Sequence, residues 1–447
     1  MIELHPRLKN TYACPICNCS VELRGFLITG MRNLVDIACP ACNRSFYVDL
    51  PAGHGLMYPF AIDQDTSEII QPENPFGRVL RIGCQQKRSE EVELKILRRV
   101  ERQEILLLNC LDYVYGHCLL KLLNAQHYID TYPALACCVL VPRQLTHLVP
   151  EGVAEIWETS IPLREYRYWW VSLERKIAAE IGKRKKAYLA PGYPHPHYSA
   201  YSLSRFGTTA RNNTLDLGTP TIAFSYRTDR LWGSTVRQQR RNITKLHGLL
   251  RNAYPQMTFV LIGPGDGLKF RPEILDKRAE GFDPAMEKTW LEILHSTDCA
   301  VGVFGSNMLL PTGLAECAVE LLPEQLYPNI LQDYLIRDDY IDPYENLYRF
   351  RVLYGNDQLT DVPPHRVAQV VSSQLTWWER FRTLLNAGKP SQGPGRNGFD
   401  PMRIVEMHDK YRGLKEPSLG ARGRSAMYRR AIWQVRKIRG MLPFSWS

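Results

Sequence analysis

The chain has 447 residues, a formal net charge of +10 and an apolar content of 45%, which is typical of a globular protein with roughly two to four domains rather than a disordered one. Its apolar runs all fall short of the about 18 residues of an ordinary membrane span, and the start MIELHPRLKN lacks the apolar core of a secretory signal. We therefore expect a cytoplasmic protein whose twelve cysteines are reduced, and either metal-bound or buried.

Two Cys-x-x-Cys pairs stand near the N-terminus, formed by Cys14, Cys17, Cys39 and Cys42. Between the pairs, residues 21–27 and 34–37 have the pattern of a hairpin. Four thiolates on two such turns can close a tetrahedron around Zn²⁺, which supplies folding free energy that so short a module cannot draw from its own core. The sequence predicts a structural zinc ribbon over residues 1–52. The alternative, a thioredoxin-like redox pair, needs one such motif and a βαβ context that is missing here.

Residues 76–204 alternate between strand and helix patterns. Strands are predicted at 104–110, 134–141, 153–157 and 186–190, with a helix at 116–129. Such alternation favours a parallel sheet covered by helices. The domain closes with the aperiodic segment 191–204, which we interpret as an interdomain connection. Its His195 and His197 are interpreted as polar loop residues, with metal binding as the minor alternative.

Residues 205–387 repeat the alternation. Strands are predicted at 221–226, 257–262, 299–304 and 347–353, a further apolar strand ends on Glu320, and helices are predicted at 235–252, 288–295 and 364–385. Two Rossmann-like halves joined by a connection describe the GT-B architecture, in which a ligand cleft lies between the domains. The predicted fold class is therefore α/β and GT-B-like, with a zinc ribbon before it and a basic C-terminal helix after it.

The last segment, 388–447, begins with a stretch rich in Gly, Pro, Ser and Arg and ends in a helical pattern at 427–442. Apolar residues of this pattern fall on one side and most of its basic residues elsewhere. A basic amphipathic helix can rest on an anionic membrane surface, and it can equally pack on the protein itself. Both alternatives stay open.

The segment 298–323 is the most informative part of the chain. It comprises an apolar strand, the turn Gly305-Ser306-Asn307, a short helical turn and a second apolar strand. Parallel sheets bind ligands at the carboxyl ends of their strands, where a glycine turn lets backbone N–H groups face a phosphate. This favours a nucleotide or nucleotide-sugar site over an ordinary βαβ unit.

Two further stretches after strands suit a donor site. Arg227 and Arg230 carry guanidinium forks that match the oxygens of a diphosphate leaving group, and Asp229 would orient an arginine. A surface ion pair is the alternative. Gly263 and Gly265 permit close approach of the backbone to a ligand.

His117 follows the strand at 104–110 and opens the next helix. Inverting glycosyl transfer needs a general base that takes the proton of the acceptor hydroxyl, and a histidine that titrates near neutrality suits this task. The sequence predicts His117 as that base. The alternative is a capping or buried structural histidine.

Two segments carry a resemblance to glycosyltransferase family 61, a GT-B family of inverting transferases. The stretch 115–120, with His117-Cys118-Leu119-Leu120, is similar to that family's His-x-Leu-Leu segment. The stretch 301–323 is similar to its Gly-His-Gly-Ala-Gly-Leu, Pro-Gly and Glu-hydrophobic-Pro block, although Phe304 stands where the block has histidine and Ser306-Asn307 replaces Ala-Gly. The resemblance implies that His117 lies near the acceptor, and that the donor nucleotide lies near Arg227, Gly305, Ser306 and Glu320.

A second resemblance concerns the α1,6-fucosyltransferase group, whose His-x-Arg-Arg-x-Asp motif compares with residues 224–229. Only its second arginine and its aspartate have counterparts, Arg227 and Asp229. This resemblance implies a GDP-fucose donor. Residues 63–65 resemble the Asp-x-Asp metal site of GT-A transferases, but they lie outside a suitable strand context and we discount them.

The sequence thus predicts a metal-independent, inverting glycosyltransferase with a nucleotide-sugar donor and a glycan or lipid-linked acceptor. Gly305, Ser306 and Asn307 would bind phosphate through the backbone, and Glu316 or Glu320 would bind the ribose. The competing hypothesis is a non-catalytic adaptor, in which the zinc ribbon and the basic tail bind nucleic acid or a partner and the α/β body is a degenerate sugar-nucleotide fold. Nucleic acid is not the expected partner, because the arginines of the ribbon are scattered among acidic residues.

Overall fold

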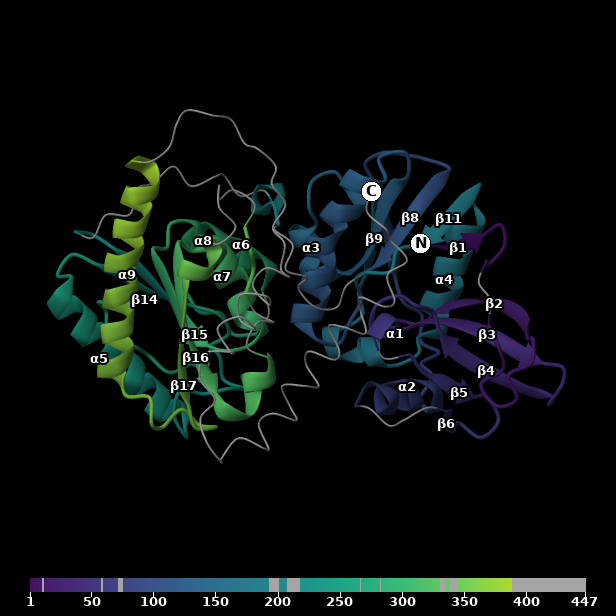
Figure 1. Cartoon of the computed structure of the whole chain (residues 1–447), viewed down its shortest axis with the longest axis horizontal. Coiled ribbons are helices and arrows are strands. Elements are labelled where there is room, and N and C mark those ends of the chain that lie inside the picture. The colour runs from purple at the N-terminus through teal and green to yellow at the C-terminus, as the bar shows by residue number, and fades with distance from the viewer. Residues whose placement is uncertain are drawn as a thin grey trace, which may run out of the picture. The chain divides into compact units, whose positions relative to one another are not determined.

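The computed structural model describes residues 1–9, 12–57, 59–70, 75–192, 201–206, 218–265, 267–281, 283–329, 334–337 and 345–387 (Figure 1). The predicted tail helix at 427–442, His195 and His197 lie outside the described residues. Within these ranges the chain forms three sheets, one of five strands and two of six. None of the described helices is long and apolar enough to cross a lipid bilayer.

The five-stranded sheet is antiparallel and belongs to the N-terminal module. Its strands, in spatial order, are β2 (Glu22–Ile28), β3 (Asn33–Cys39), β4 (Arg44–Asp49), β5 (Ala61–Asp63) and β6 (Ile69–Ile70). The predicted hairpin is the β2–β3 pair. The sheet continues beyond residue 52, after the short helix α1 (His54–Met57), because β5 pairs with β4. Strands as short as β5 and β6 show no alternating pattern that a sequence could reveal.

The first six-stranded sheet has the order β1-β11-β8-β9-β10-β7, with its four central strands parallel and its two edge strands antiparallel. The strands are β1 (Ile2–His5), β7 (Leu94–Arg98), β8 (Glu104–Asn109), β9 (Ala136–Pro142), β10 (Glu155–Thr159) and β11 (Lys186–Leu189). The helices are α2 (Pro75–Gln85), α3 (Tyr115–Thr131) and α4 (Val171–Gly182), with 3₁₀ turns η1 (Arg143–Leu148), η2 (Leu163–Arg167) and η3 (Leu203–Phe206). Strand β1 comes from the N-terminus, so the ribbon segment also contributes an edge strand here.

The ribbon and this sheet share one apolar core. Val35, Ile37 and Phe46 of the ribbon belong to the same buried cluster as Ile105 and Leu107 of β8. The N-terminal module therefore packs on the α/β unit through an apolar face. Its buried residues belong to a larger core than so short a module could form by itself.

The second six-stranded sheet is parallel throughout, with the order β14-β13-β12-β15-β16-β17. Its strands are β12 (Thr221–Ser225), β13 (Thr258–Ile262), β14 (Leu275–Asp276), β15 (Cys299–Val303), β16 (Cys317–Pro323) and β17 (Phe350–Gly355). The helices are α5 (Val236–Ala253), α6 (Pro284–His295), α7 (Leu309–Leu314), α8 (Glu345–Tyr348) and α9 (Pro364–Ala387), with turns η4 (Ser306–Met308) and η5 (Glu324–Asn329). Figure 1 shows α5 and α9 along one side of this sheet.

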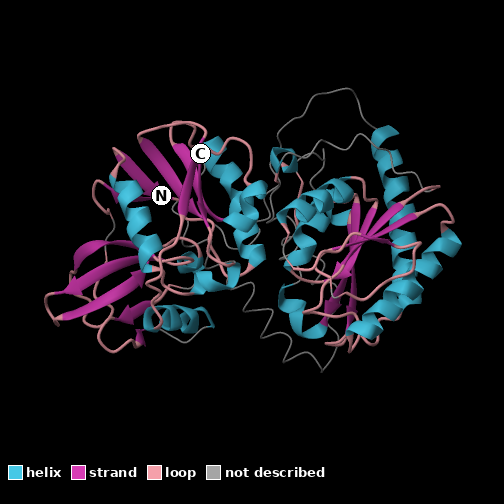
Figure 2. Cartoon of the chain, turned by 180° about the vertical axis from the view of Figure 1, so that it is seen from behind, coloured by secondary structure: helices cyan, strands magenta, loops and turns pink. Residues whose placement is uncertain are grey.

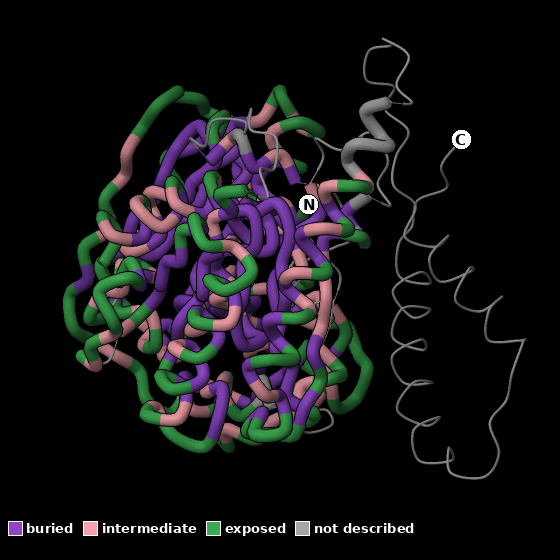
Figure 3. The backbone as a smooth tube through the Cα atoms, turned by 90° about the vertical axis from the view of Figure 1, so that its left-hand side faces the viewer, coloured by how far each residue is buried: buried purple, intermediate pink, exposed green. Residues whose placement is uncertain are grey.

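Most predicted boundaries differ from the observed ones by a few residues, and two of the differences have a clear cause. Helix α6 begins at Pro284 rather than at residue 288, because Asp283 caps it by accepting a hydrogen bond from the Ala285 N–H. Strand β16 runs through Glu320 to Pro323, because β15 and β17 pair with it on both sides. The layering of helices over strands is visible in Figure 2, and Figure 3 shows the buried interior within an exposed periphery.

The two α/β units contact each other through α3 and η1 of the first and α6, α7 and η4 of the second. Leu119 of α3, Leu291 of α6 and Leu309 of α7 belong to one buried cluster. Glu287 of α6 adds polar contacts, because it accepts a hydrogen bond from the Tyr115 hydroxyl and its carboxylate lies 3.0 Å from Nε2 of His147. The two α/β units therefore meet at the start of α3.

Candidate functional site

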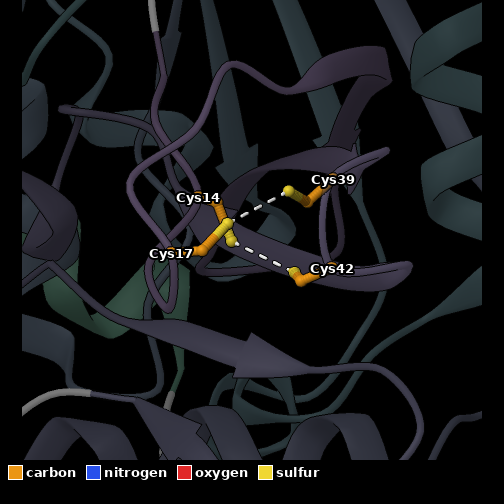
Figure 4. Close-up of side chains that lie close together, drawn as sticks. All are labelled: Cys14, Cys17, Cys39 and Cys42. Carbon is orange, nitrogen blue, oxygen red and sulfur yellow. Dashed lines mark hydrogen bonds between the residues drawn. The ribbon is translucent and has the colours of Figure 1, made fainter.

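The four ribbon cysteines converge in space (Figure 4). The sulfurs of Cys14 and Cys42 are 3.6 Å apart and those of Cys17 and Cys39 are 3.5 Å apart. A zinc–thiolate tetrahedron with bonds of about 2.3 Å requires sulfur separations of about 3.8 Å. The arrangement can therefore hold a metal ion that prefers four thiolates.

Both knuckles use the same turn. Asn18 and Asn43 directly follow the second cysteine of each pair and adopt positive φ angles of 59° and 54°. Each donates its backbone N–H to the carbonyl of the first cysteine, Cys14 or Cys39, at 2.9 Å. Asparagine tolerates this left-handed conformation better than most residues. The repeated Cys-Pro-x-Cys-Asn pattern is thus a sequence signal for this turn.

The hydrogen-bonding environment of Cys14 favours a thiolate. Burial opposes ionisation, but hydrogen bonds from the N–H groups of Cys17 and Ile16 and from the side chains of Cys17 and Cys42 together outweigh it and lower the pKa of the Cys14 thiol to about 7. Metals bind the thiolate form, so this ligand is prepared for binding near neutral pH.

His117 lies in the first turn of α3, beside a buried carboxylate. Its Nδ1 is 3.4 Å from Oδ1 of Asp112, and its side chain is 18% exposed. Asp112 follows β8 at the carboxyl edge of the first sheet and is fully buried. The carboxylate also contacts Nε2 of His54 at 2.8 Å and Nζ of Lys121 at 3.2 Å.

On the second sheet, two arginines converge on one carbonyl. Nη1 of Arg227 and Nη1 of Arg230 each donate to the Phe304 carbonyl oxygen at 3.1 Å. The sequence predicts that Asp229 orients an arginine, and in the structure its carboxylate accepts from Nε and Nη2 of Arg227 at 2.7 and 2.6 Å. The Arg227 side chain is 8% exposed and that of Asp229 is 67% exposed, so the pair spans the boundary between interior and solvent.

Glycine at position 305 makes this convergence possible. Gly305 has a φ of 142°, and a Cβ there would collide with Nη1 of Arg227 and lie 2.8 Å from Nη1 of Arg230. Asn307 completes the turn, since its side chain accepts from Arg227 and donates to the Ser225 hydroxyl. The turn at 305–307 and the arginines therefore form one structural unit after β15.

Strand register places Glu320 beside this unit. Ser225, Gly302 and Glu320 are paired neighbours on β12, β15 and β16. Side chains at matched positions of adjacent parallel strands point to the same face of a sheet, so buried Glu320 shares the face on which Ser225 contacts Asn307.

The structure does not bring all predicted residues to this edge. Glu316 precedes β16 at its amino end, where its carboxylate accepts from the indole N–H of Trp378 at 3.1 Å. Glu316 therefore lies at the opposite end of the strand from the turn at 305–307, which follows the carboxyl end of β15. Gly263 is required by the protein itself, since its φ is 104° and a Cβ would collide with the Tyr226 carbonyl. The backbone N–H of Gly265 donates to the Ala279 carbonyl at 2.6 Å.

The two predicted halves of the site meet directly. A Cβ on Gly116, the residue before His117, would lie 2.5 Å from Cβ of Ser306 and 3.3 Å from Leu309. The first turn of α3 is therefore packed against the turn that follows β15. The histidine on one unit and the arginine-stabilised turn on the other belong to the same region.

Sequence reasoning missed His54, Asp112 and Lys121. His54 lies just beyond the predicted ribbon boundary, so no motif included it. A signal was present for the other two, because Asp112 lies two residues after the predicted strand at 104–110 and Lys121 interrupts the apolar helix stretch Leu119-Leu120-Lys121-Leu122-Leu123. A lysine within such a run needs a buried partner.

The sequence matches no protein-family model and no curated protein. Among solved structures, the chain is similar to the ADP-heptose LPS heptosyltransferase II of E. coli, with a TM-score of 0.36, 14% identity, and coverage of 62% of this chain and 99% of that one. It is also similar to a family 9 glycosyl transferase of Veillonella parvula DSM 2008, with a TM-score of 0.35, 10% identity, and coverage of 63% and 99%. A third similar structure is the dodecameric iron-containing heptosyltransferase TibC in complex with ADP-D-β-D-heptose. Its TM-score is 0.36 and its identity 10%, with coverage of 82% of this chain and 98% of that one. A likeness this distant assigns no activity to the chain, and it shows neither the family 61 nor the α1,6-fucosyltransferase resemblance.

Proposed function

We propose that this protein is an inverting, metal-independent glycosyltransferase that moves a sugar from a nucleotide-diphosphate donor to a glycan or lipid-linked acceptor. One observation carries the proposal, namely the packing of Gly116 against Ser306. This contact joins the helix turn that bears a histidine to a glycine turn stabilised by two arginines. A group transfer requires a base on the acceptor side and charge stabilisation on the leaving-group side within one region.

On the acceptor side, His117 would take the hydroxyl proton as the oxygen attacks the anomeric carbon. The bond to the diphosphate breaks in the same step, and the negative charge passes to the leaving phosphate. A neutral imidazole within hydrogen-bond reach of the hydroxyl suits this role.

On the donor side, the residues divide into two roles. Arg227 is charge-paired with Asp229 and bonded to Asn307, so it holds the turn in shape. Arg230, which is partly exposed, would contribute positive charge to the diphosphate, together with backbone N–H groups of the 305–307 turn. Glu320 is the remaining carboxylate for the ribose.

The proposal is tested first by binding. A thermal-shift panel of ADP, UDP, GDP and CMP, each with its sugar derivatives, should reveal one nucleotide that raises the melting temperature. A ligand at 100 times its Kd adds about 2.7 kcal/mol to the free energy of unfolding. Arg230→Gln should abolish the shift, whereas Arg237→Gln, an exposed position nearby on α5, should retain it.

The outcomes separate the alternatives. A response to GDP-fucose alone would favour a fucosyltransferase, as the second resemblance implies. If no nucleotide shifts the wild-type protein, the transferase proposal fails and the non-catalytic adaptor is favoured. Once a donor is known, His117→Ala should abolish transfer while calorimetry still detects nucleotide binding; retained turnover would exclude His117 as the base.

For the ribbon, we propose a structural zinc ion bound by Cys14, Cys17, Cys39 and Cys42. Four thiolates suit Zn²⁺ and also iron. Elemental analysis of the purified protein should give one zinc ion per chain. If it gives one iron ion instead, together with a thiolate-to-iron absorption band, the metal in this site is iron rather than zinc.

A further inference from the structure

The carboxylate of Asp112 is fully buried and has four polar neighbours. Oδ1 accepts from the Val114 N–H at 3.2 Å and lies 3.4 Å from Nδ1 of His117. Oδ2 accepts from Nζ of Lys121 at 3.2 Å and lies 2.8 Å from Nε2 of His54. A carboxylate has about four acceptor positions, so this environment matches its full capacity.

The charges in the cluster fix its protonation. Burial alone would keep Asp112 neutral, but Lys121, His117 and His54 more than compensate and hold the pKa of the carboxyl well below its usual range. Burial lowers the pKa of His54 to about 4, so this imidazole is neutral at pH 7. Nζ of Lys121 lies 3.2 Å from this carboxylate as its buried ion-pair partner, and a buried carboxylate is tolerated when it is paired in this way.

An ionised carboxylate only accepts hydrogen bonds, so each imidazole nitrogen that faces it must carry hydrogen. For His54 this nitrogen is Nε2, and for His117 it is Nδ1. A neutral His117 with hydrogen on Nδ1 has its lone pair on Nε2, and this is the tautomer that accepts a proton there.

We infer that Asp112, His54 and Lys121 are positioning residues that hold His117 in its Nδ1–H tautomer and present Nε2 as the base. The inference rests on the proposed function for its catalytic meaning, but the tautomer is a property of the protein alone.

The inference makes the metal-binding ribbon part of the site. His54 begins α1, which follows strand β4 of the ribbon sheet. The ribbon is also bonded to the end of β8, because Nδ2 of Asn109 donates to the Gly30 carbonyl and to Oδ1 of Asn33, both at 2.9 Å. If the ribbon depends on its metal ion for folding, loss of the ion would displace His54. The effect would then pass through Asp112 to His117.

The same three side chains, His54, Asp112 and His117, have ligand atoms within 4.8 Å of one another, close enough to surround a metal ion. Lys121 argues against this use, because its ammonium group contacts the same carboxylate oxygen as His54. A cation between the imidazoles would be repelled at short range in a buried site.

The test is the ¹⁵N spectrum of imidazole-labelled protein at neutral pH, with His117 assigned through His117→Gln. Wild-type His117 should give the Nδ1–H pattern. Asp112→Asn should lower the ratio of Nδ1–H to Nε2–H by about 10- to 150-fold, the equivalent of one hydrogen bond to a charged group. Asp130→Asn, an exposed position on the same helix, should leave the ratio unchanged.

Further variants distinguish positioning from simple support. His54→Gln and Cys17→Ser, if their circular dichroism is native, should shift the ratio in the same direction by a smaller factor. With a donor in hand, Asp112→Asn should lower kcat more than KM and alter the pH profile of kcat. A wild-type His117 in the Nε2–H form, an unchanged ratio in Asp112→Asn, or a second metal ion lost in His54→Gln would each overturn the inference. Failure of nucleotide binding would instead refute the proposed function and leave the tautomer result standing.

Discussion

The contact between Gly116 and Ser306 can be tested by one methyl group. In Gly116→Ala, the new Cβ would lie 2.5 Å from Cβ of Ser306, closer than two such atoms can approach. Both atoms are attached directly to backbone, so relief requires movement of α3 or η4. Overpacking of this kind costs about 1–3 kcal/mol. Alanine gains at most about 1 kcal/mol over glycine in a helix interior, and less at the second residue of α3, so the clash should dominate.

Hydrogen exchange is the suitable assay, because a protein of several units need not unfold in one step. Amides in the first turn of α3 and in 305–309 should exchange about 5- to 150-fold faster in Gly116→Ala, the equivalent of about 1–3 kcal/mol. Ser306→Gly should restore protection in the double variant, since it removes the clashing atom.

Gly248 offers a matched control. It is exposed within α5, and a Cβ there would meet no atom within 4 Å. Gly248→Ala should therefore stabilise the chain by about 0.5–1 kcal/mol. If Gly116→Ala were as well protected as the wild type, or if Ser306→Gly gave no rescue, the packing of α3 on η4 would be refuted, and with it the observation that carries the proposed function.

Three other predictions follow from the described residues. Chelation of the metal should lower the melting temperature, and so should Cys17→Ser. Cys19 is exposed and lies outside the cluster, so Cys19→Ser should change the free energy of unfolding by no more than about 0.5 kcal/mol. Equal effects of the two variants would contradict the four-cysteine site. The pKa of His54 is lowered by burial from 6.5 to about 4, so the unfolded chain binds the proton first as pH falls, and stability is lost between pH 6.5 and pH 4. Across this window the free energy of unfolding of the wild type should fall by roughly 3 kcal/mol relative to His54→Gln, as measured by urea unfolding at each pH. Burial raises the pKa of Asp49 to about 6, which gives the opposite trend. Both proteins contain Asp49, so its contribution cancels in the comparison. Buried Arg349 donates to the carbonyls of Thr312, Ala315 and Glu316. Arg349→Met should lower the free energy of unfolding by about 3 kcal/mol or more, because each buried acceptor left unpaired costs about 1–3 kcal/mol. A melting temperature equal to that of Arg351→Met would show that these hydrogen bonds contribute nothing.

Features that depend on near neighbours in the chain were accessible from the sequence. The Cys-x-x-Cys spacing predicted the four-cysteine cluster, because each knuckle is one local turn. Apolar strands and helices were predicted within a few residues, because their periodicity reflects which face is buried. Thr235 was included at the start of the predicted helix, and it is the N-cap of α5, where its hydroxyl accepts from Gln238.

Features that depend on register or on distant segments were decided by the tertiary structure. Glu316 and Glu320 are equivalent as sequence candidates, and only the pairing of β16 with β15 places Glu320 at the level of Gly302 and Glu316 at the opposite end. The ribbon sheet continues past residue 52 into β5, which is too short to show a pattern in the sequence. His54 and Asp112 meet only because the ribbon packs on β8, and the charge balance provided by Lys121 exists only after burial. The sequence by itself therefore determined the local chemistry, while packing between remote segments decided which side chains share a site.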